Sequence, residues 1–170
     1  MSSGSMAGDL PQKEIQLPGA HHGQVFGLLE ILDDYGGKAD LARIADDVFL
    51  ELDDLLPASE TAEILGLAKV DAGDITLTEE GKRFLAAGIR RRKKIIQQRL
   101  LELEIFKMVL DFVKKNDDGD GVEKDKVIAF LNSIISERDP ELCFRWIVEW
   151  ARHGLLLRYD SQGNRVKPQR

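Results

Sequence analysis

The sequence contains a single cysteine, Cys143, so no internal disulfide can form and no oxidising compartment is indicated. It has no run of the roughly 18–20 apolar residues that a membrane-spanning helix needs, and no signal peptide. We therefore expect a soluble cytoplasmic protein with no direct membrane insertion.

Motifs that would indicate catalysis or metal binding are also missing. The three histidines, His21, His22 and His153, lack the spacing of a structural zinc site. No glycine-rich phosphate loop, nucleophile elbow or pair of catalytic carboxylates is present. These absences predict a protein that is not an enzyme and that uses no cofactor or metal.

One acidic segment, NDDGDGVEKDKV, begins like the calcium-binding loop of an EF-hand. Its twelfth position, where a bidentate glutamate should complete the calcium shell, is Val127, and Glu123 occupies the usually apolar eighth position. Because the coordination shell would stay open, we interpret the segment as a polar turn.

What the chain does contain is ordinary globular material, with 170 residues, 43% of them hydrophobic and 32% charged. Residues 1–12, MSSGSMAGDLPQ, are interpreted as a disordered arm or a cloning remnant. Charge is divided unevenly: residues 11–86 carry 6 Lys/Arg and 16 Asp/Glu, whereas residues 87–170 carry 18 and 13. This asymmetry indicates two halves, at 13–88 and 89–170.

The first half has the pattern of three helices, a hairpin and a closing helix. Apolar residues three or four apart predict a first helix that ends at Gly36-Gly37, and Asp40 is expected to cap a second. A short turn and a third helix follow, with Pro57 near the helix start. Two short strands joined by DAGD come next, and Thr78 is expected to cap the closing helix.

The second half repeats this order. Its apolar residues predict one long amphipathic helix over residues 89–115; they are Ile96, Leu100, Leu103, Phe106, Leu110 and Val113. A second helix, a third helix that begins at Asp139-Pro140, and two strands around the turn DSQGN follow. The predicted fold class is mainly α (α+β), with two tandem winged helix-turn-helix-like units joined by a long helix.

Such units often bind DNA through their third helix. In the first half, residues 51–66 carry five carboxylates and no Lys or Arg, so a duplex with about one negative charge per 1.7 Å would repel them. In the second half, residues of alternating sign lie three or four apart, and this face is predicted to neutralise itself; they are Glu141, Arg145, Glu149 and Arg152. The large apolar residues on that helix are interpreted as core; they are Phe144, Trp146, Ile147 and Trp150.

Five consecutive cations, Arg90 to Lys94, remain to be explained. They sweep through about 400° of a helix, so they cannot form a single stripe. The run is interpreted either as a solvated helix start that the acidic half partly neutralises, or as a docking contact for an acidic protein partner. Binding to nucleic acid is the third-ranked interpretation. The candidate partner-binding residues are Arg90, Arg91, Arg92, Lys93, Lys94, Arg145 and Arg152.

Four features together give a resemblance to a known family. They are the GLLEIL helix with its GG stop, the step DDLLP, the segment LTEEGKRF, and WAR followed by LLLRYD. From about residue 21 to the last strand, the chain resembles the AAA-associated C-terminal domain. That domain follows the ATP-binding cassette in the ATPase subunits of nitrate/sulfonate/bicarbonate-type ABC importers.

The resemblance implies a non-enzymatic regulatory or assembly module. Its expected partner is an ABC ATPase or permease component, through which it would lie peripherally at the inner membrane; the oligomeric state stays open. Two alternatives remain, a winged-helix transcription regulator that binds DNA and a sensor of a small molecule or anion held between the units.

Overall fold

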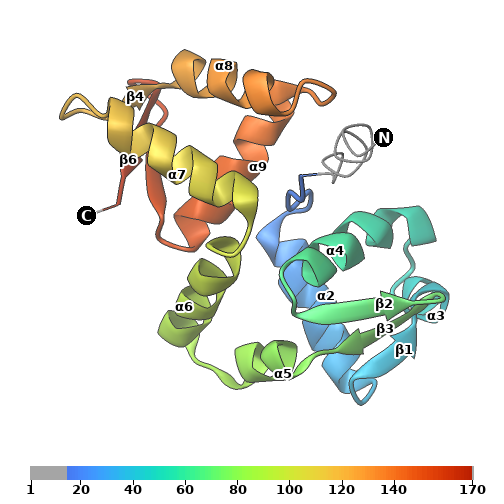
Figure 1. The fold of residues 1–170 in the computed structure, drawn as a ribbon. Helices are drawn as coiled ribbons and strands as arrows, with labels where there is room; N and C mark the ends of the chain where they lie inside the picture. Colours follow the sequence, from blue (N-terminus) through green and yellow to red (C-terminus); the bar gives the residue numbers. More distant parts are fainter. Residues whose placement is uncertain (1–14, 170) are drawn as a thin grey trace, which may run out of the picture.

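Residues 15–169, described by a computed structural model, form a mainly helical protein with two small antiparallel sheets (Figure 1). The predicted arm at residues 1–12 lies outside the described residues. The elements of the first half are α2 (His22–Asp34), β1 (Lys38–Asp40), α3 (Leu41–Asp47), α4 (Leu52–Ile64), β2 (Ala68–Asp71), β3 (Asp74–Leu77) and α5 (Glu79–Ala86). Those of the second half are α6 (Ile89–Leu100), α7 (Glu104–Asn116), β4 (Val122–Glu123), α8 (Lys124–Ile134), α9 (Pro140–His153), β5 (Leu157–Asp160) and β6 (Arg165–Pro168).

The same order of helix, strand, helix, helix, strand and strand occurs in both halves, from α2 to β3 and from α7 to β6. The sheets are ordered β1-β3-β2 and β4-β6-β5, with all neighbours antiparallel. Sequence analysis predicted both hairpins but neither of the short strands β1 and β4. These two strands contain only three and two residues, which is too short for an alternating pattern to appear.

Side chains that the sequence identified as helix caps do cap helices. Oδ1 of Asp40 accepts a hydrogen bond from the Ala42 N–H at 2.8 Å. Thr78 accepts from the Gly81 N–H at 3.0 Å, and Asp139 accepts from the Glu141 N–H at 3.0 Å. Each bond satisfies one of the free donors of a helix N-terminus, so the starts of α3, α5 and α9 are fixed locally.

The prediction of one long helix over residues 89–115 is wrong. The chain forms α6 and α7, separated by a turn in which the Leu103 N–H bonds to the Leu100 carbonyl at 2.9 Å. Leu100, Leu103 and Phe106 keep a helical spacing through the turn, so periodicity could not detect it. The break lets α6 pack against α5 and α9 while α7 packs against α8 and β6, two surfaces that one straight helix could not reach.

The position of Pro57 also differs from the prediction. It lies inside α4, the sixth residue of that helix, because α4 begins at Leu52 without a preceding separate turn. Asp53 and Asp54 occupy its first turn, where negative charge is favourable.

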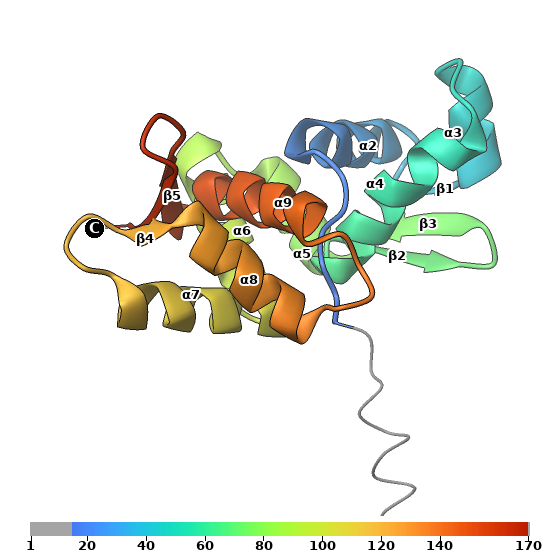
Figure 2. The same ribbon diagram turned by 90° about the horizontal axis from the view of Figure 1, so that it is seen from above.

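One continuous hydrophobic core extends through both halves. Figures 1 and 2 show the halves joined by α5 and α6, with the start of α2 beside α9. Trp150 of α9 and Phe84 of α5 are fully buried near this junction. Within residues 15–169, none of the helices combines the length and apolarity needed to cross a bilayer.

Candidate functional site

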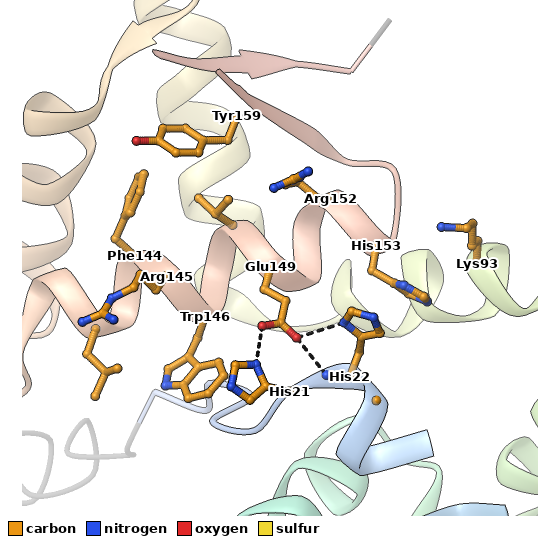
Figure 3. A pocket seen from close by; sticks show the side chains of 13 residues that line it. His21, His22, Lys93, Phe144, Arg145, Trp146, Glu149, Arg152, His153 and Tyr159 are labelled. Carbon is orange, nitrogen blue, oxygen red and sulfur yellow. Dashed lines mark hydrogen bonds and ion pairs between the residues drawn. The ribbon is translucent and has the colours of Figure 1, made fainter. Parts of the chain in front are cut away.

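A groove of about 1040 Å³ runs along α9, at the junction of the two halves. We call it the α9 groove. Its wall is built from four segments: α9, the start of α2 with the residue before it, Lys93 of α6 and Tyr159 of β5 (Figure 3). The side chains that line it include His21, His22, Lys93, Phe144, Arg145, Trp146, Glu149, Arg152, His153 and Tyr159.

A carboxylate held between two histidines lies at the centre of the groove. Oε1 of Glu149 is 2.7 Å from Nδ1 of His21, and Oε2 is 2.9 Å from Nδ1 of His22. The backbone N–H of His22 donates a further hydrogen bond to Oε2 at 2.8 Å. Glu149 therefore ties the start of α2 to α9, two elements about 130 residues apart in the sequence.

A second hydrogen bond also joins α9 to the residues that precede α2. The indole Nε1–H of the buried Trp150 donates to the Ala20 carbonyl at 3.0 Å. Rings of His22 and His153 stack with centroids 4.6 Å apart, and His21 meets Trp146 edge-on at 4.9 Å. All three histidines of the chain thus meet at one place.

The local environment shifts two pKa values at this junction. Burial alone would raise the pKa of Glu149, but hydrogen bonds from the His22 backbone and from both histidine rings together lower it. Burial, and then the nearby charges of His22 and Lys93, lower the pKa of His153 to about 4, although Glu149 acts in the opposite direction. Nε2 of His153 is buried and has no hydrogen-bond partner among residues 15–169.

We predict that acidification weakens the fold through His153. The folded imidazole binds its proton only near pH 4, whereas the unfolded one does so near 6.5, so between these values the unfolded state binds more protons. The free energy of unfolding should fall by on the order of 1–2 kcal/mol over that interval, allowing for a side chain that is only half buried. Loss of the Glu149 contacts should add to the decrease at its acidic end.

Urea unfolding of the wild type and of His153→Gln at a series of pH values would measure this effect. The variant should have a flatter profile between the two pKa values. An identical slope in both proteins would show that His153 does not carry the pH dependence.

Three of the seven predicted partner-binding cations, Lys93, Arg145 and Arg152, line the α9 groove. Arg145 and Arg152 are exposed. None of the three side chains has a hydrogen bond or ion pair within the part of the chain that the structure describes. Figure 3 shows Arg145 and Arg152 on either side of Glu149.

The predicted self-neutralisation of α9 is therefore wrong. Glu141 pairs with Lys124 of α8 at 3.0 Å, and Glu149 is occupied by the two histidines. Helical spacing placed the opposite charges on one face, but tertiary contacts give both carboxylates other partners. Among residues 15–169, no group pairs with the guanidinium groups of Arg145 and Arg152.

The other members of the cationic run have separate positions. Arg92 is structural, because its guanidinium donates to the carbonyls of Phe84, Leu85 and Ala87 at 3.0–3.1 Å and lies over the Phe84 ring. It also pairs with Glu30 of the acidic half at 3.6 Å, in agreement with partial neutralisation by that half. Arg90, Arg91 and Lys94 are exposed on α6 outside the groove.

Most large apolar residues of α9 belong to the core, as predicted. Phe144, Ile147 and Trp150 are buried, and only Trp146 is half-buried in the wall of the groove. Sequence reasoning did not predict that the three histidines and Glu149 would meet. No local pattern could have indicated it, because the contact joins the two ends of the chain.

The comparison with protein families gives one match. A family model described as the C-terminal AAA-associated domain matches residues 42–160, well over half of the chain. The chain belongs to this family. Among curated proteins and among solved structures, no significant match to the chain was found.

The matched AAA-associated domain contains most of the α9 groove but not all of it. Lys93, Arg145 and Arg152 lie inside residues 42–160, whereas His21 and His22 precede them. The resemblance noted from the sequence began near residue 21, so the family model confirms the domain over a shorter range.

The acidic loop before β4 is a polar turn, as predicted. Its anionic groups surround Arg165 of β6, whose guanidinium donates to the Asp118 carboxylate and to the Asp120 carbonyl at 2.9 Å. Backbone hydrogen bonding and Arg165 together lower the pKa of Asp118. Within residues 15–169, no group of three or more potential ligands is placed to hold a metal ion.

Proposed function

We propose that this protein is a non-enzymatic regulatory or assembly module that acts beside the ATPase of a nitrate/sulfonate/bicarbonate-type ABC importer. Membership of the AAA-associated family supports an accessory role next to an ATPase. The module would act through protein–protein contacts, with each half serving as a winged-helix unit. It would lie at the inner membrane only through the transporter complex.

The observation that carries this proposal is the set of cations in the α9 groove that have no ion-pair partner within the described part of the chain. Arg145 and Arg152 are seven residues apart, which places them on one face of α9 about 10 Å apart along its axis. Between them lie the apolar edge of Trp146 and a Glu149 whose charge is already engaged. An acidic segment of a partner, with two carboxylates at a matching distance and an apolar residue between them, fits this surface.

We predict that reversing both arginines weakens binding to the cognate ATPase component. Arg145→Glu together with Arg152→Glu should raise the Kd by about tenfold or more, because each guanidinium would be replaced by a charge that repels the acidic segment. Isothermal titration calorimetry or surface plasmon resonance at several salt concentrations would measure the Kd. The wild type should lose affinity as the salt concentration rises.

A matched control changes the net charge equally on a distant surface. Lys107 of α7 and Lys126 of α8 are both exposed and lie outside the groove, so Lys107→Glu with Lys126→Glu should bind like the wild type. Equal loss of affinity in both double variants would point to overall charge rather than to the groove. No binding of the wild type would reject the proposed function.

One observation favours the alternative, a winged-helix DNA-binding regulator. The guanidinium groups of Arg145 and Arg152, which have no partner in residues 15–169, lie on the third helix of the second half, the position from which such units contact bases. Against this, α4 presents Asp53, Asp54, Glu60 and Glu63 without a cation. Duplex binding that falls steeply with salt and disappears in the arginine double variant would favour the regulator.

A further inference from the structure

The connection between α3 and α4 displays apolar side chains in an acidic setting. Phe49 is 94% exposed, Leu50 48% and Leu52 39%. Five exposed carboxylates flank them in the sequence; they are Asp46, Asp47, Glu51, Asp53 and Asp54. We call residues 46–54 the Phe49 loop.

Backbone hydrogen bonds hold the Phe49 loop in a defined shape. Phe49 follows the end of α3 with φ of 59°, in the left-handed region that favours glycine. The Leu50 N–H bonds to the Ala45 carbonyl at 2.9 Å and the Phe49 N–H bonds to the Asp46 carbonyl at 3.3 Å, the paired bonds of a Schellman helix end. The chain therefore keeps a phenylalanine in a strained position and points it into water.

This combination indicates a protein contact rather than a lipid contact. An exposed group of large apolar side chains marks a binding surface. Carboxylates around it would be repelled by an anionic membrane surface, which attracts cations instead. The complementary surface must offer apolar area together with positive charge.

The same chain carries such a surface on α6. At 100° per residue, four exposed residues of this helix and the exposed residue directly after it fall within an arc of about 100°; they are Arg90, Arg91, Lys94, Gln98 and Leu101. We call this set the α6 face. Its three cations have no hydrogen bond or ion pair between their side chains and any other described residue. Leu101 is 38% exposed. Ile89, the first residue of α6, is 78% exposed but lies outside this arc.

We propose that the Phe49 loop of one copy of this protein docks on the α6 face of a second copy. Phe49 and Leu50 would cover Leu101, and the flanking carboxylates would pair with the three cations, which have no partner among residues 15–169. Two such contacts related by a two-fold axis close a dimer; contacts that do not close extend into larger assemblies. Both surfaces lie outside the α9 groove, so this contact is independent of the proposed ATPase contact.

We predict that substitutions on either surface weaken self-association without harming the fold. Sedimentation equilibrium over a wide concentration range should show the wild type associating beyond its 19.1 kDa monomer. Phe49→Gly removes the apolar contact and relieves the strained φ, so it should weaken association by about tenfold or more, with a Tm that is not lower than that of the wild type. Arg90→Glu with Arg91→Glu should weaken it similarly through repulsion.

Mixing the two variants tests the pairing itself. A Phe49→Gly copy keeps an intact α6 face and an Arg90→Glu/Arg91→Glu copy keeps an intact Phe49 loop, so the mixture should associate more strongly than either variant alone. A wild type that stays monomeric at all concentrations would overturn the proposal. So would association that Arg90→Glu/Arg91→Glu leaves unchanged, because the Phe49 loop would then contact something other than the α6 face. Sedimentation of the wild type with vesicles, without self-association, would overturn it in favour of a membrane.

Discussion

Replacing Trp150 by alanine should destabilise the protein by about 3–5 kcal/mol, the largest loss that we expect from a single substitution. Trp150 has no exposed surface and fills the core where α9 meets the first half. The substitution removes this volume together with the edge-on contact to Phe26, whose ring centroid is 5.9 Å away. It also leaves the buried Ala20 carbonyl without its hydrogen bond from the indole.

Two comparisons separate the contributions of packing and hydrogen bonding at this position. Trp150→Phe keeps most of the apolar volume but loses the N–H donor, so it should cost about 1–3 kcal/mol. Trp146→Ala changes the other tryptophan, which is half-buried at the groove, and should cost about 1 kcal/mol. Urea unfolding measures all three variants. A similar decrease in the free energy of unfolding for Trp146→Ala and Trp150→Ala would contradict the larger contribution that we expect from Trp150.

Gly81→Ala should destabilise the protein by about 2–3 kcal/mol, even though alanine is the better helix former. Gly81 lies in the first turn of α5, and a Cβ there would overlap the Leu67 carbonyl oxygen and approach its carbon to 3.0 Å. That carbonyl cannot move freely, because it accepts a hydrogen bond from the Thr78 N–H. The helix would have to shift away from the strand that it closes.

Gly27→Ala is the matched control for this effect. Gly27 also lies in a helix, α2, but apart from its chain neighbours and the adjacent backbone of its own helix, no atom of residues 15–169 is within 4 Å of the position that its Cβ would occupy. Here only the helix propensity changes, so the substitution should stabilise the protein by about 0.5–1 kcal/mol. Thermal unfolding should therefore move in opposite directions for the two variants. A Tm for Gly81→Ala at or above the wild-type value would contradict the predicted close contact.

Local features of the fold were predictable because their physical causes lie within a few residues. Asp40, Thr78 and Asp139 cap helices through bonds to N–H groups two or three residues away. The positive φ values of Gly36 and Gly37 agree with the predicted end of the first helix. The capping side chains supply hydrogen-bond acceptors next to the helix starts, and the two glycines can adopt the positive φ at the helix end.

Predictions failed where distant segments decide the outcome. The apolar spacing over residues 89–115 is the same for one helix as for two, so only the surfaces packed against α6 and α7 decide that the chain turns at Leu103. On α9, spacing indicated that Glu149 would neutralise its neighbouring arginines, yet His21 and His22 reach it from the other end of the chain.

The sequence by itself determined the mainly helical class, the repeated element order and the division of charge between the halves. These follow from short-range hydrogen bonding, hydrophobic spacing and composition, all of which are readable along one chain. Only the tertiary structure decided which of the seven cations is structural, which line the α9 groove and which lie outside it. The role of each cation depends on which carboxylates and carbonyls lie within about 3–4 Å of it. Folding sets these distances between residues that are far apart in the sequence.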